Sequence, residues 1–216
     1  MMELELYSYW RSSCSWRVRI ALSYKGLDFH YAPIHLVRDG GEQHSGEYRL
    51  RNPMEEVPVL YVQGQALSQS TAILEYLEEV YPEPALLPNS AMERARVRQL
   101  SQIINSGTQP IQNLGVMQKL AKDCGLDKAA TQKWSKDWIS RGLGAFAQAV
   151  ASFGGRYSYG DEVSLADCCL VPQLYNARRF GVDLAPLAEL VAIESRLSSL
   201  PAFVAAHPDA QPDAQL

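Results

Sequence analysis

Residues 4–22, LELYSYWRSSCSWRVRIAL, contain the pattern around which the chain is organised. The first five of these residues alternate in polarity, which is typical of a β-strand. Further on, Val18, Ala21 and Leu22 fall on one face of a helix, and Lys25-Gly26 supplies a C-terminal stop signal. The pattern therefore predicts a strand, a polar turn and a helix.

The predicted turn holds two hydroxyls and a thiol, those of Ser12, Ser13 and Cys14. It lies where the unpaired N–H groups and the positive dipole end of the helix point outward. Such a place stabilises an anion, and in particular a thiolate, which is either Cys14 itself or the thiol of a bound cofactor. A purely structural interpretation competes with this one, because serines commonly cap helices and Cys14 would then be a small buried filler.

The composition argues against several classes of function. The chain has 216 residues, enough for one large domain or two small ones. Apolar residues make up 47%, charged residues 20%, and the net charge is −4, so no nucleic-acid partner is expected. The acidic N-terminus enters a strand at once, and no apolar run reaches about 18–20 residues. We therefore expect a cytoplasmic protein with no signal peptide and no membrane association.

The cysteines are expected to be reduced thiols. Cys14, Cys124, Cys168 and Cys169 lack the paired spacing of a zinc site or of a small disulfide framework, so no metal site is expected. Cys168 and Cys169 lie in an apolar helical run, which predicts that they pack in the core.

The first 83 residues predict a thioredoxin-like α/β domain of βαβ-ββα order. After the first strand and helix we expect a second strand at 29–34 and a short helix around 43–50. A third strand starts at Pro58, and a hairpin turn at Gly64-Gln65 leads to a short fourth strand at 66–67. A helix with an apolar stripe then opens at 68–71. Residues 84–88 are the predicted linker.

Helical periodicity dominates beyond the linker, which predicts an all-α domain over residues 89–207. Helices are expected over 92–122 (bent or broken by Gly107 and Pro110), 126–153, 165–176, 186–197 and 202–207. Ser164 and Asp167 have the spacing of a capping box, and Arg178 and Arg179 are expected just past the helix that it opens. Residues 208–216 are polar and contain proline, so we expect a flexible tail.

Four landmarks resemble the soluble glutathione transferases. They are the turn before the first helix, Val57-Pro58 before a strand, Gln69-Ser70 opening the next helix, and the capping box at Ser164 to Asp167. Within that superfamily, residues 12–22, 52–54, 109–113 and 171–173 resemble the zeta class. The resemblance covers nearly the whole chain and implies the glutathione transferase fold, glutathione as cofactor and a homodimer.

The resemblance also implies roles for particular residues. Ser12, Ser13 and Cys14 would surround the glutathione sulfur and act in catalysis. Val57, before a proline that is cis in relatives (Pro58 here), would pair its main chain with the cysteinyl part of glutathione. Gln69 and Ser70 would hold the γ-glutamyl carboxylate at the N-terminus of their helix, as the physics of helix ends favours. Further contacts are implied for Gln43, Gln109, Asn113, Leu114 and Gly115.

The substrate implied by the resemblance is an anionic diketo acid, for which the planar fork of arginine is well suited. Arg11 and Arg179 are the candidates for substrate binding, with the all-helical domain completing the pocket. Arg178, Arg17 and Arg19 are weaker candidates, and for Arg17 and Arg19 we expect surface ion pairs instead.

The zeta class includes maleylacetoacetate isomerase, an enzyme of tyrosine and phenylalanine catabolism. The implied reaction is glutathione-dependent cis–trans isomerisation of maleylacetoacetate to fumarylacetoacetate, by thiolate addition, bond rotation and elimination. Glutathione transferase activity toward other electrophiles would accompany it. In this scheme Ser12 or Ser13 is the essential donor to the thiolate and Cys14 is supportive.

Three alternatives are compatible with the sequence. The first is maleylpyruvate isomerase, of gentisate breakdown, in the same family. The second is a glutathione-dependent thiol transferase in which Cys14 forms a mixed disulfide; Arg17 occupies the third position after Cys14, so a C-x-x-C pair is absent. The third is an interaction module without activity, although such modules tend to lose residues like Val57 and Ser70.

Overall fold

The structure, a computed structural model, describes residues 3–215, and within them the chain divides into two compact units. One combines the described residues up to Leu86 with those from Ser198 onward, and we call it the sheet unit. The other, Leu87–Leu197, is the helical unit. The boundary between Leu86 and Leu87 falls inside the predicted linker.

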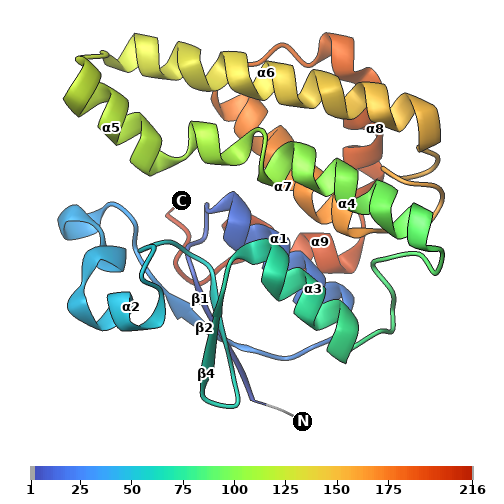
Figure 1. Cartoon of the computed structure of the whole chain (residues 1–216), viewed down its shortest axis with the longest axis horizontal. Coiled ribbons are helices and arrows are strands. Elements are labelled where there is room, and N and C mark those ends of the chain that lie inside the picture. The colour runs from blue at the N-terminus through green and yellow to red at the C-terminus, as the bar shows by residue number, and fades with distance from the viewer. Residues whose placement is uncertain (1–2, 216) are drawn as a thin grey trace. The chain divides into compact units, whose positions relative to one another are not determined.

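The sheet unit contains a four-stranded mixed sheet in the order β2-β1-β3-β4 (Figure 1). The strands are β1 (Leu4–Ser8), β2 (His30–Pro33), β3 (Val59–Val62) and β4 (Gln65–Ser68). β1 pairs parallel with β2 and antiparallel with β3, and β3 pairs antiparallel with β4. This order confirms the predicted thioredoxin-like arrangement. The hairpin turn is formed by Gln63 and Gly64, both with positive φ, one residue earlier than predicted.

The helices of the sheet unit differ in length and in how deeply they are buried. They are α1 (Ser13–Tyr24), η1 (Arg38–Gly40), η2 (Glu42–His44), α2 (Gly46–Arg51), α3 (Ser70–Val80), α9 (Pro201–Ala206) and η5 (Pro208–Ala210). α1 packs against both α3 and α9. Residues 15–22 of α1 are all buried, so this helix has no solvent-facing side over that length.

Alternation along the strands assigns side chains to the two faces of the sheet. Leu6 lies opposite Leu60 on one face, and both are fully buried. Tyr7 lies on the other face, where its ring meets the edge of Tyr48 from α2. Tyr48 also packs in a buried cluster with Tyr9, Trp10, Val57 and Val59. This cluster therefore supports the residues that directly follow β1 and those that directly precede β3.

The helical unit is built from α4 (Ala91–Asn105), η3 (Gln109–Gln112), α5 (Leu114–Cys124), α6 (Lys128–Phe153), α7 (Leu165–Arg179), η4 (Ala185–Leu187) and α8 (Ala188–Leu197). The predicted capping box is confirmed, since the Ser164 N–H donates to Asp167 at 2.8 Å at the start of α7. Burial of the Asp167 carboxyl raises its pKa, and the hydrogen bonds from Ser158 and Ser164 oppose that shift. Cys168 and Cys169 are buried in α7, as predicted.

The break predicted at Gly107 and Pro110 is confirmed, because the segment over 92–122 forms α4, η3 and α5 with Pro110 inside η3. Two other predicted boundaries differ from the structure. α7 continues to Arg179, so Arg178 and Arg179 lie in its last turn and not past its end. The segment from Ser198 belongs to the sheet unit, whereas a helical domain reaching residue 207 was expected.

The expectation of a flexible tail also differs from the structure. Asp213 accepts hydrogen bonds from the main-chain N–H of Trp10 at 3.0 Å and from the hydroxyl of Tyr31 at 2.7 Å. Gln211 is buried and donates to the carbonyls of Ala205 and His207. The polar side chains that suggested flexibility are instead the groups that attach this segment. Among residues 3–215, no helix is long and apolar enough to cross a membrane.

Candidate active site

The register of the sheet collects the predicted residues of the sheet unit at one edge. β1 and β2 end side by side at Ser8 and Pro33, β3 begins opposite Tyr7, and β4 ends opposite Val59. The segments that follow β1, β2 and β4 and precede β3 therefore start from the same edge, which we call the site edge. Its predicted residues are Arg11, Ser12, Ser13, Cys14, Gln43, Val57, Pro58, Gln69 and Ser70.

The turn after β1 presents polar hydrogens at the start of α1. Ser12 is the N-cap, and its Oγ accepts from the N–H of Ser15 at 3.2 Å, which leaves its own hydroxyl hydrogen free to donate. The N–H groups of Ser13 and Cys14 have no intrahelical acceptor at this position, and the helix dipole makes them positive. The capping and the functional interpretations of Ser12 are thus compatible, because the cap uses the oxygen and an anion would use the hydrogen.

Val57 and Pro58 present main chain at the same edge. The peptide bond between them is cis, as the resemblance implied. Ladder pairing of β3 begins only at Val59, so the N–H and C=O of Val57 lie outside the sheet ladder. An extended peptide can therefore pair with them.

The start of α3 has the properties of a carboxylate site. Gln69, which precedes it, has a φ of 73°, a conformation that costs a residue with a side chain about 1–3 kcal/mol. Ser70 is the first helical residue, and its Oγ accepts a hydrogen bond from Arg17 Nη1 at 3.3 Å. The guanidinium of Arg17 therefore adds a full positive charge beside a helix N-terminus, and it joins the start of α1 to the start of α3.

Arg17 and Arg19 are the residues that sequence reasoning placed wrongly. Both are buried in α1, whereas surface ion pairs were expected. Arg19 donates four hydrogen bonds, to Ser8 Oγ and to the carbonyls of Tyr9, Trp10 and Ala206. Burial lowers the pKa of Arg19 to about 10, so the group stays protonated at neutral pH.

A signal for this burial was present in the sequence. Trp16, Val18, Ile20, Ala21 and Leu22 surround the two arginines on every side of the helix. A helix that is apolar all round has no polar face, so it must be buried together with any charges that it carries.

Two other predicted residues of the sheet unit have local partners. Gln43 in η2 is buried, and its Nε2 donates to the carbonyl of Leu36 at 3.3 Å. Its Oε1 is buried and has no hydrogen-bond partner among the described residues. The guanidinium of Arg11 is partly exposed and lies over the Trp10 ring, 5.2 Å from its centroid.

The helical unit places its five predicted residues in two regions. Gln109 lies in η3, Asn113 caps α5 through a 2.7 Å bond from the N–H of Leu114, and Leu114 and Gly115 are exposed in the first turn of α5. Arg179 is exposed at the end of α7, with its guanidinium 5.1 Å from the Phe180 ring centroid. Arg178, a weaker candidate, is bound by Glu194 through both terminal nitrogens.

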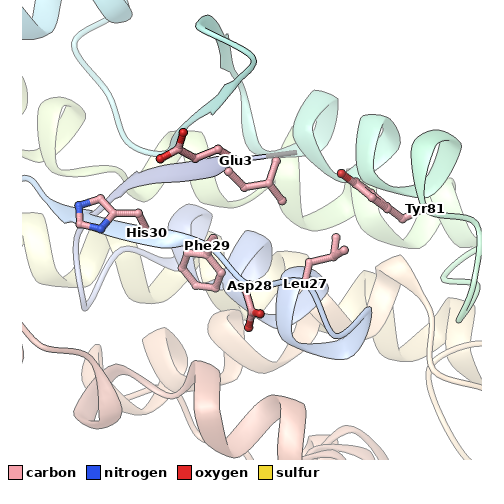
Figure 2. Close-up of a pocket in the computed structure, with 7 residues that line it drawn as sticks. Glu3, Leu27, Asp28, Phe29, His30 and Tyr81 are labelled. Atoms are coloured by element: carbon pink, nitrogen blue, oxygen red, sulfur yellow. The ribbon is translucent and has the colours of Figure 1, made fainter. Parts of the chain in front are cut away.

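A cavity of about 460 Å³ lies at the opposite edge of the sheet (Figure 2). It is lined by Glu3, Leu4, Leu27, Asp28, Phe29, His30 and Tyr81. Leu4 and His30 are the first residues of β1 and β2, so the cavity is separated from the site edge by the length of these strands. None of the predicted site residues lines it.

Comparisons with known proteins identify the family of this chain. Residues 6–85 match the model of the glutathione S-transferase N-terminal domain. A relative from Drosophila melanogaster, named probable maleylacetoacetate isomerase 2, is 50% identical over 208 residues, which are 96% of this chain and 89% of the relative.

Two solved structures are similar over nearly their whole length. A holo maleylpyruvate isomerase, described as a bacterial glutathione S-transferase of the zeta class, has a TM-score of 0.94 at 44% identity and covers 98% of this chain and 100% of its own. The maleylacetoacetate isomerase of Anaeromyxobacter dehalogenans 2CP-1, with glutathione bound in its active site, has a TM-score of 0.89 at 50% identity and covers 99% of each chain. A further structure of that protein holds dicarboxyethyl glutathione and citrate. This chain belongs to the glutathione S-transferase family, and within it to the zeta class, which includes the maleylacetoacetate and maleylpyruvate isomerases.

Proposed function

We propose that this protein is a maleylacetoacetate isomerase, converting maleylacetoacetate to fumarylacetoacetate with glutathione as cofactor. The observation that carries the proposal is the site edge. It brings together the N-terminus of α1, the cis bond before Pro58 and the N-terminus of α3, in a chain that is 50% identical to a named isomerase. Glutathione transferase activity toward other electrophiles belongs to the same proposal.

The residues of the site edge fit the chemical groups of glutathione. Its thiolate suits the hydroxyl of Ser12 and the first N–H groups of α1, and its cysteinyl amide suits the main chain of Val57. Its γ-glutamyl carboxylate suits Ser70 and the N-terminus of α3, next to the charge of Arg17. The strained φ of Gln69 supports this assignment, because strain of this kind tends to occur at binding and active sites.

Glutathione, when bound, supplies the thiolate whose reversible addition to the cis double bond allows that bond to rotate before elimination. The task of Ser12 and Ser13 is to donate hydrogen bonds that lower the pKa of the thiol. Cys14 is in the same turn and only partly buried, so a bound sulfur could reach it, and we assign it a supportive role.

We assign substrate recognition to Arg11 and Arg179, since a carboxylate is best held by a guanidinium fork. Dicarboxyethyl glutathione and citrate, both bound to the relative from A. dehalogenans, are polycarboxylates, which supports an anionic substrate. For Gln109, Asn113, Leu114 and Gly115, contact with glutathione stays a prediction from the family resemblance. We further propose that the protein acts as a cytoplasmic homodimer in tyrosine and phenylalanine catabolism.

Maleylpyruvate isomerase is the second candidate, because a structure with that name has a TM-score of 0.94 with this chain. The experiment compares maleylacetoacetate and maleylpyruvate side by side, with and without glutathione. We expect glutathione-dependent turnover with a higher kcat/KM for maleylacetoacetate. A preference for maleylpyruvate would exchange the two candidates, and turnover of neither substrate would contradict both.

The hydroxyl donors are tested with Ser12→Ala, Ser13→Ala and the double variant at saturating glutathione. We expect the more important hydroxyl to account for a loss of roughly 100-fold in kcat, the size typical of one donor to a developing or bound anion. Cys14→Ser tests the supportive role assigned to Cys14 and should retain isomerase activity. If the double alanine variant keeps wild-type turnover, the role of the hydroxyls is wrong.

A further inference from the structure

The C-terminal segment lies against the turn that precedes Ser12. One carboxylate oxygen of Asp213 accepts from the main-chain N–H of Trp10 at 3.0 Å, and the other accepts from the hydroxyl of Tyr31 at 2.7 Å. These partners are 203 and 182 residues away in sequence. Asp213 thus joins the end of the chain both to β2 and to the turn after β1.

Neighbouring residues hold this segment in place independently of Asp213. Gln211 is bound to two carbonyls at the end of α9, and Ala214 packs on the apolar cluster that contains Tyr9 and Trp10. Gln215 and His35 are joined side chain to side chain at 2.9 Å. The main chain at Asp213 is therefore held by contacts of the residues that precede it and of those that follow it.

Arg19 holds the same turn from within the unit. Its guanidinium donates to the carbonyls of Tyr9 and Trp10, at 3.3 and 2.8 Å, and to the carbonyl of Ala206 at the end of α9. The carbonyl of Tyr9 also accepts from the N–H of Ser12 at 3.0 Å, which closes the turn. Consequently the N–H of Trp10 is held by Asp213, while the carbonyls of Tyr9 and Trp10 are held by Arg19.

We propose that Asp213 is a positioning residue for the active-site turn: together with Arg19 it clamps the two peptide groups of Trp10 and so fixes where Ser12, Ser13 and Cys14 lie. A small displacement of a catalytic donor is enough to lower a rate strongly, so such a clamp matters for turnover. The role in catalysis rests on the proposed function, whereas the clamp itself does not.

A carboxylate suits this position better than an amide. Both partners are donors, and burial raises the pKa of Tyr31, so its hydroxyl keeps its proton over the working pH range. An ionised carboxylate accepts with both oxygens, while asparagine accepts with only one. Asp213→Asn therefore removes the charge and can keep a bond to Tyr31 only if its amide donates to the Tyr31 hydroxyl oxygen, which replaces a charge-assisted bond by a weaker one with almost no change in shape.

The experiment compares Asp213→Ala, Asp213→Asn and Tyr31→Phe with wild type. The matched control is Asp209→Ala, which removes an exposed acid of the same segment that is paired with His207 and not with the turn. Two quantities are measured on folded protein: the pH profile of kcat at saturating glutathione, and amide hydrogen exchange of the peptide that covers residues 9–16.

We expect Asp213→Ala to speed exchange of this peptide at least tenfold and to lower kcat about tenfold at neutral pH. Its pH profile should shift upward by about one unit, so that activity is regained at higher pH, because the displaced turn stabilises the thiolate less; loss of the Asp213 charge acts in the opposite direction and is the smaller effect. Asp213→Asn should show a smaller shift in the same direction, Tyr31→Phe a smaller one again, and Asp209→Ala none.

The possible outcomes distinguish failure of the positioning role of Asp213 from failure of the proposed isomerase function. Wild-type exchange and a wild-type pH profile in Asp213→Ala would overturn the proposal. Faster exchange with an unchanged pH profile would show a structural contact only, and would also overturn the positioning role. If the wild-type protein has no isomerase turnover, the proposed function fails, and the exchange measurement still decides whether Asp213 holds the turn. If Asp213→Ala does not fold, the nearly isosteric Asp213→Asn decides by the same two readouts.

Discussion

Two buried cations of the sheet unit, Lys25 at the end of α1 and Arg19 in its middle, are held in opposite ways. Lys25 Nζ donates to the Glu78 carboxylate at 2.8 Å and to the carbonyls of Tyr81 and Pro84. Arg19 bonds only to oxygens of neutral groups, four of them, and no carboxylate is among these partners. Lys25 is paired directly with a carboxylate, whereas Arg19 is bonded to neutral groups and feels the Asp213 carboxylate only through space.

The two ends of α1 therefore differ in how their cationic side chains are compensated. Lys25 lies at the C-terminus of α1, where the helix dipole favours a cation, and Glu78 cancels its charge. Arg17 lies within the first turns of α1, where the dipole is already positive, and the Arg19 guanidinium reaches the turn before it. Two guanidinium groups near the start of α1 disfavour the helix but favour a bound anion, which agrees with the anion site that we propose at this edge.

The variant with the largest expected effect on this comparison is Lys25→Met. We expect the free energy of unfolding to fall by about 3–5 kcal/mol, because Glu78 would be left buried without its counter-charge. Urea denaturation measures the loss. The double variant Lys25→Met with Glu78→Gln should recover part of it, and glutathione affinity of the folded single variant should stay near wild type. A loss below about 1 kcal/mol would show that the Lys25–Glu78 ion pair contributes no more to stability than an exposed pair does.

The second test changes Arg17. We expect Arg17→Met to weaken glutathione binding about tenfold, roughly 1.4 kcal/mol, because a positive charge beside the N-terminus of α3 is lost. Arg17→Lys keeps the charge and should fall between. Isothermal titration with a glutathione analogue that lacks the γ-glutamyl carboxylate is the control. Equal losses for glutathione and for the analogue would contradict the assignment of that carboxylate to α3.

The smallest expected effect concerns backbone strain. Gln69 at the site edge and Gln63 in the hairpin turn both have positive φ, at 73° and 51°. Replacing either residue by glycine should stabilise the protein by about 1 kcal/mol, because glycine adopts such conformations freely. Thermal unfolding measures this gain. Only Gln69→Gly should also weaken glutathione binding, and an unchanged Kd would remove its side chain from the site.

The elements and their order were predictable because they depend on local patterns. Apolar alternation predicted β1, and the spacing of Ser164 and Asp167 predicted the start of α7. The two isomers of an X-Pro bond are written identically in a sequence. The cis bond before Pro58 was therefore suggested by the family resemblance alone. The end of α7 was misjudged, because helix ends depend on weak signals that neighbouring contacts override.

The sequence by itself determined the class of fold, the family and the residues Ser12, Val57 and Ser70 as candidates, since each carries a short-range signature. Only the tertiary structure decided that these segments leave from one edge of the sheet, that Arg17 and Arg19 are buried there, and that Asp213 attaches the C-terminal segment to the turn after β1. The physical reason is separation along the chain. Contacts between residues up to 203 positions apart leave no periodic or local signal, and they exist only once the sheet has brought their segments together.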